Sequence, residues 1–152
     1  MARYDIPFGT NISLTAATAK TVVAVSTSAT RRARIMGFGL GFDSTTATDN
    51  SVLVEVVRSD GTTAGTATSR TPVPLDPGES AALCSGFVNY SAEPTTLVVV
   101  REFRITPVGG GVIYPLEFLD AIYAATTSKV LGLRLTAAQN QSNVRGFLTF
   151  EE

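Results

Sequence analysis

A chain of 152 residues is long enough for one domain whose hydrophobic core needs neither a disulfide nor a metal ion. Charged residues make up 16% of the chain and the formal net charge is -1, which argues against an electrostatic nucleic-acid binder, so we predict no nucleic-acid partner. The chain has a single Cys and no apolar run long enough to span a membrane, so we predict a protein made in a cytoplasm that contacts no membrane.

Near the start, apolar side chains alternate with other residues. Tyr4, Ile6 and Phe8 share one face of an extended segment, and a proline between them disfavours a place inside a sheet. We therefore predict that residues 1–10 form an arm in front of a single domain at 11–152. The arm either adds to the sheet edge of a neighbouring copy or covers the core of its own domain. In the first case Tyr4, Ile6 and Phe8 are candidate assembly contacts.

The only cluster of basic residues is Arg31-Arg32-Ala33-Arg34. Guanidinium groups form bidentate hydrogen bonds with carboxylates, so Arg32 is a candidate contact to a neighbouring subunit. The alternative is a solvated strand entry that binds nothing. The chain has ten Arg against two Lys, a bias that is typical of protein interfaces and also of GC-rich genomes.

The clearest strand is expected at 34–42, where four large residues alternate with glycines. Met36, Phe38, Leu40 and Phe42 should share one face. The glycine face carries no side chains of its own, so we expect another backbone or a bulky side chain to lie close against it.

Further strands and turns are expected along the rest of the chain. The apolar segment 52–58 leads into Asp60-Gly61, a typical type I′ turn, so we predict a hairpin with 66–70. Other strands are expected at 12–15, 21–25, 97–105, 116–123, 131–135 and 144–150. About eight or nine short strands predict an all-β fold, either a β-sandwich or a jelly-roll-like barrel.

One segment favours a helix. Asp76 can cap its start, Pro77 suits its first position, and Glu79 can complete the capping box. We therefore predict one short helix near 77–84. The whole connection at 71–96 is unusually long, and long ordered connections often bind partners, so it is the first candidate for a partner-facing loop.

The residues for most catalytic chemistry are missing. The chain has no His, and Cys84 has no base or metal-ligating partner nearby in the sequence, so we expect a small buried apolar residue. The glycines at 109–111 lack the Lys-Ser/Thr of a phosphate loop. We predict no enzyme, no cofactor and no metal site. A pair of carboxylates that cleaves glycans stays open as an alternative.

Several segments, in this order, resemble small β-sandwich proteins of tailed-bacteriophage heads. They are the arginine cluster with the Ile after it, residues 52–58 (VLVEVVR), 72–77 (PVPLDP), 92–95 (AEPT) and 147–152 (FLTFEE). The resemblance spans about four fifths of the chain and implies a capsid decoration (cement) protein. Such a protein sits on the exterior of the virion, binds the major capsid protein and itself, forms a homotrimer, and has no cofactor.

Two other functions remain open at this point. Another virion module, such as a tail-tube or head-fibre subunit, would share this composition but polymerise without a capsid. A glycan-binding domain is the second alternative. The chain has no Trp and only 8% aromatic residues, which disfavours the stacking platforms that sugar sites use.

Overall fold

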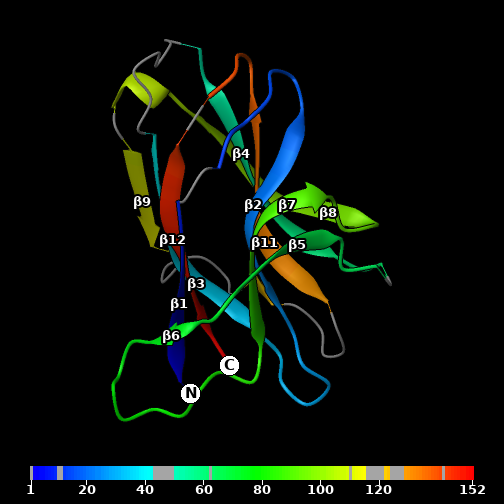
Figure 1. Cartoon of the computed structure of the whole chain (residues 1–152), viewed down its shortest axis with the longest axis vertical. Helices are drawn as coiled ribbons and strands as arrows, with labels where there is room; N and C mark the ends of the chain where they lie inside the picture. The colour runs from blue at the N-terminus through cyan, green and yellow to red at the C-terminus, as the bar shows by residue number, and fades with distance from the viewer. Residues whose placement is uncertain are drawn as a thin grey trace.

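The computed structural model describes residues 2–9, 12–42, 50–61, 63–109, 111–115, 122–123, 129–141 and 143–152. Two antiparallel sheets of six strands each pack face to face (Figure 1). Among the described strands, both sheets end in strands that pair on one side only. The predicted all-β class is confirmed, and the fold is the sandwich rather than a closed barrel.

The first sheet has the order β10-β3-β12-β1-β6, with β9 also paired to β3. Its strands are β1 (Arg3–Phe8), β3 (Arg34–Phe42), β6 (Val73–Pro74), β9 (Gly111–Pro115), β10 (Ile122–Tyr123) and β12 (Val144–Glu151). The second sheet has the order β5-β7-β2-β11-β4-β8. Its strands are β2 (Ala19–Ser26), β4 (Val52–Ser59), β5 (Thr66–Arg70), β7 (Ser85–Ala92), β8 (Leu97–Ile105) and β11 (Val130–Ala137). The strands outnumber the predicted eight or nine because β1, β6, β7 and β9 fall where an arm or loops were expected.

The apolar faces of the two sheets meet in one core. Ile6 and Phe150 of the first sheet and Leu133 of the second are fully buried there. The rings of Tyr4 and Phe150 stack with their centroids 5.4 Å apart. This burial is the main stabilising contribution, since apolar area removed from water contributes about 25 cal/mol per Å².

β3 shows the predicted alternation with one shift. A β-bulge skips Met36, so Ile35 takes its place in the core beside Phe38 and Leu40. On the glycine face, a Cβ added at Gly39 would lie 2.4 Å from the ring of Phe147. The expected bulky neighbour of the glycine face is therefore present.

β1 is a strand of the first sheet, which corrects the prediction of an arm at 1–10. It pairs with β12 along its whole length and with β6 at Tyr4 and Asp5. Pro7 fits because β6 ends before it, so β1 has a partner on only one side there. The proline marks a local edge, and the domain already includes β1 at its start.

The predicted hairpin at Asp60-Gly61 is also wrong. β4 pairs with β8 and β11, whereas β5 pairs with β7. Gly61 does not adopt the positive φ that a type I′ turn requires. A Cβ at Gly61 would lie 2.5 Å from the carbonyl oxygen of Thr95, so the glycine permits a close approach of two connections. The chain continues into β5 beside the segment that joins β7 to β8.

The predicted helix near 77–84 is replaced by one turn. Oδ1 of Asp76 accepts a hydrogen bond from the N–H of Gly78 at 2.9 Å, and the Asp76 carbonyl accepts one from the N–H of Glu79 at 3.0 Å. The last two amides of the predicted helix donate to the carboxylate of Glu152 instead. Asp76 thus caps a turn, and no helical ladder continues from it.

Three smaller outcomes complete the fold. Residues 12–15 make only the bridge between Leu14 and Gln141 instead of a strand. Of the strand expected at 116–123, residues 116–121 lie outside the described residues, whereas 122–123 pair with β3 as β10. Within the described ranges, no helix has the length and apolar character to cross a membrane.

Candidate functional site

The segment 71–84 forms a loop at the end of the sandwich where both termini lie (Figure 1). It leaves β5 of the second sheet, adds β6 to the first sheet beside β1, and returns to β7. Val73, Leu75 and Leu83 in this loop are 51%, 53% and 57% exposed. Exposed apolar side chains of this size are candidates for contacts with other proteins.

Backbone contacts with β1 fix the first half of the 71–84 loop. Tyr4 pairs with Pro74 in the sheet, and the N–H of Leu75 donates to the carbonyl of Arg3 at 2.9 Å. The hydroxyl of Tyr4 donates to the carbonyl of Ser80 at 3.0 Å, which ties the turn of the loop to the same strand. The exposed side chain of Leu75 therefore stands on a backbone that the sheet holds in place.

The carboxylate of Glu152 fixes the second half of the loop. Oε1 accepts the N–H of Leu83 and Oε2 accepts the N–H of Cys84, both at 2.8 Å. The N–H of Glu152 in turn donates to the carbonyl of Ala2 at 3.2 Å. A single carboxylate thus satisfies two successive amides that have no strand partner, and it positions the exposed Leu83.

Replacing Glu152 with alanine is expected to release the loop without unfolding the sandwich. Hydrogen bonds to a charged group contribute about 1.5–3 kcal/mol each, so exchange of the Leu83 and Cys84 amides should accelerate at least roughly tenfold. Amide hydrogen exchange measures this directly. Glu79→Ala is the matched control, because Glu79 belongs to the same loop and receives neither amide. Unchanged protection in Glu152→Ala would show that the sheet alone holds the loop.

A hollow of about 580 Å³ lies beside the loop. Arg31, Glu79 and Leu83 contribute to its wall together with Tyr4 and Glu152. Both signs of charge therefore stand next to apolar surface. This combination suits the side chains of a protein partner, which also present charged and apolar groups side by side.

Cys84 lies under the loop and is 2% exposed. Burial, together with a hydrogen bond to Glu152, raises the pKa of its thiol to about 11. The thiol therefore stays protonated at neutral pH and is a poor nucleophile. This confirms the expected small buried residue.

The four residues predicted as assembly contacts do not come together. Tyr4, Ile6 and Phe8 are 2%, 0% and 7% exposed and pack in the core of their own domain, which is the second of the two alternatives for this segment. Arg32 is exposed and lies just before β3. Of the four, Arg32 alone lies on the surface of the chain.

The predicted partner-facing connection at 71–96 is shorter than expected, because β7 occupies much of its second half. The individual side chains that stand out, Val73 and Leu75, were not foreseen. Their signal lies in the prolines around them, since a proline keeps a segment out of central strands and thereby leaves its apolar neighbours uncovered. For Leu83 no such local signal exists.

Within the part of the chain that the structure describes, no three His, Cys, Asp or Glu side chains lie close enough to hold a metal ion. Comparison with protein-family models, curated proteins and solved structures finds no match. The fold and the 71–84 loop are therefore the basis for any functional conclusion.

Proposed function

We propose that this chain is a non-enzymatic structural subunit that binds the outer surface of an assembled tailed-phage capsid through the 71–84 loop. The observation that carries the proposal is the rigid presentation of Val73, Leu75 and Leu83. A preorganised backbone loses little conformational entropy on binding, so exposed apolar side chains on it contribute more of their burial energy to affinity. The major capsid protein is the proposed partner.

The sequence supports the same surface. One of the segments that resemble phage decoration proteins, residues 72–77, lies in this loop. The mechanism is linkage: a subunit that binds only the assembled shell stabilises that state by its own binding free energy, repeated over many copies. No chemical step is required of any side chain.

Co-sedimentation with empty expanded heads of a candidate phage tests the proposal. The chain should pellet with the heads, and the double variant Leu75→Asp/Leu83→Asp should lose at least roughly tenfold in affinity because it places charge in the contact. Val108→Asp is the matched control, since Val108 is 56% exposed on the short 3-10 helix η1 (Pro107–Gly109) at the opposite end of the sandwich (Figure 1).

Three results would contradict the proposal. If the wild-type chain stays in the supernatant, the capsid is not its partner. If the wild type and both variants pellet equally, another surface makes the contact. If the chain forms long polymers in the absence of heads, the tail-tube or fibre alternative replaces the decoration role.

A further inference from the structure

β8 forms one edge of the second sheet. Among the described residues it pairs with β4 alone. Its other side therefore presents a row of backbone N–H and C=O groups, which is the surface that strands of other chains pair with. Val98, Val99 and Val100 on this strand are 40%, 38% and 38% exposed, so the edge also presents apolar side chains.

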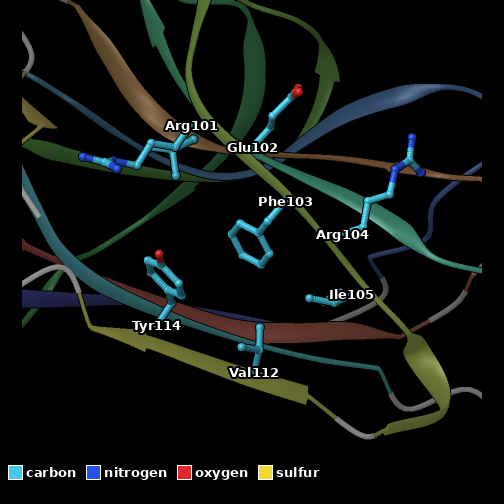
Figure 2. A pocket seen from close by; sticks show the side chains of 8 residues that line it. Arg101, Glu102, Phe103, Arg104, Ile105, Val112 and Tyr114 are labelled. Atoms are coloured by element: carbon cyan, nitrogen blue, oxygen red, sulfur yellow. The ribbon is translucent and has the colours of Figure 1, made fainter.

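The edge borders a cleft of about 520 Å³ between the two sheets (Figure 2). Phe103 of β8 points into it toward Tyr114 of β9, and their ring centroids are 5.3 Å apart. The ring of Phe38 stacks on both of these rings from the core. The cleft is largely apolar and open at the β8 edge. Its wall also contains one buried hydrogen-bond donor, Nε of Arg101, that lacks a partner among the residues that the structure describes.

The charges on the other face of β8 indicate what pairs with it. Arg134 of β11 binds the carboxylate of Glu55 on β4 at 2.8 Å, and Glu55 lies directly opposite Glu102 of β8. Arg134 thus neutralises Glu55, whereas the residue opposite Glu102 on β4 is a second carboxylate and not a cation. A strand added outside β8 gains most if it places a cation opposite Glu102. Arg104 lies two residues further along β8, on the same face as Glu102 and away from Tyr114 (Figure 2).

A second copy of β8 supplies that cation. In an antiparallel pair related by a two-fold axis through Phe103, Glu102 of each copy lies opposite Arg104 of the other. An axis through Glu102 or through Arg104 would instead place like charges opposite each other. We propose that the protein forms a two-fold dimer in which residues 101–105 of β8 pair with the same residues of a second copy, centred on Phe103. The two Phe103 side chains then meet at the mouths of both clefts.

This dimer is separate from the proposed capsid contact. β8 runs through the middle and upper part of Figure 1, whereas the 71–84 loop lies at the lower end, so both surfaces remain accessible together. A single strand pair buries less surface than the roughly 1,200 Å² of a stable interface, so a dissociation constant in the micromolar range is expected. The two-fold contact also differs from the trimer that the phage resemblance implies.

Charge exchange tests the dimer and its register together. Glu102→Arg and Arg104→Glu should each raise the dissociation constant of the homodimer at least roughly tenfold, because each places like charges opposite each other twice. An equimolar mixture of the two variants should dimerise again, since every pair is then complementary. The double variant Glu102→Arg/Arg104→Glu should dimerise like the wild type for the same reason. Sedimentation velocity across a concentration series gives the dissociation constants of the wild type, the two single variants, their mixture and the double variant.

The alternative outcomes are distinct. If the wild-type chain stays monomeric at high micromolar concentration, the dimer proposal is wrong. The same holds if the chain forms a trimer that neither substitution weakens. Neither result affects the capsid proposal. If both single variants dimerise more weakly and their mixture does not restore dimerisation, the register centred on Phe103 is wrong. The Glu102 and Arg104 variants should pellet with capsids like the wild type, because their 71–84 loop is unchanged. A loss of pelleting that occurs only in Leu75→Asp/Leu83→Asp therefore tests the proposed function and not the dimer.

Discussion

Replacing Ile6 with alanine is expected to lower the free energy of unfolding by about 2–5 kcal/mol, the range for a fully buried aliphatic side chain whose cavity cannot collapse. Ile6 is 0% exposed and lies opposite Leu148 in the β1·β12 pair. Gly86 of the facing sheet packs against it, since a Cβ at Gly86 would lie 3.1 Å from Cγ1 of Ile6. Both sheets therefore confine the site, and the upper part of the range applies.

Ile113→Ala is the matched control, because Ile113 is 74% exposed and the same atoms are removed. Its effect should stay within about 0.5 kcal/mol. Urea unfolding followed by circular dichroism measures both variants, with equal slopes expected if only stability changes. Equal, small effects of the two substitutions would mean that β1 detaches easily and behaves as the arm that its sequence suggested.

The period-two pattern of Tyr4, Ile6 and Phe8 did predict an extended segment with one apolar face. It did not reveal the partner, because pairing with β12 joins residues at opposite ends of the chain. Pro7 prevents pairing on both sides of the strand at its own position. It does not restrict the pairing of the other residues in the segment. A local pattern specifies which face is buried, whereas the sheet that buries it depends on distant residues.

The hairpin and the helix predicted from turn and cap residues were wrong for a related reason. Asp60-Gly61 and Asp76 have the residue types of a hairpin turn and a helix cap. The chain does bend at Gly61 and at Asp76. Distant groups determine the path of the chain after each bend: the backbone of Thr95 beside Gly61, and the carboxylate of Glu152 at the end of the predicted helix. Tertiary contacts overrode the local preference in both segments.

The candidate site was predictable only in outline. The length of the 71–96 connection points to the region, but the exposure of Leu83 depends on Glu152, which is far away in the sequence. The edge of the proposed dimer is even harder to predict from the sequence. The sequence of β8 shows an ordinary alternating strand, and only the order of strands in the sheet shows that its outer side has no partner among the described residues.

Replacing Glu55 with alanine is expected to cost about 3 kcal/mol, because it leaves the guanidinium of Arg134 without its anion. The pair is bidentate, with Nε and Nη2 of Arg134 at 2.8 and 3.0 Å from the two carboxylate oxygens. The Glu55 side chain is 8% exposed and that of Arg134 is 21% exposed. The hydrogen bond to Glu55 raises the pKa of Arg134, so this guanidinium is charged at neutral pH.

A surface pair and a double substitution show whether burial is the cause. Asp60→Ala breaks the ion pair with Arg58, whose side chains are 48% and 37% exposed, and should cost no more than about 0.5 kcal/mol. Glu55→Leu/Arg134→Met removes both buried charges at similar volume and should be close to neutral, because the desolvation of two ions disappears together with their attraction. Urea unfolding of the three variants measures the differences. If the double variant is as unstable as Glu55→Ala, the pair contributes net attraction beyond its desolvation, and the charged row across β11, β4 and β8 stabilises the sheet.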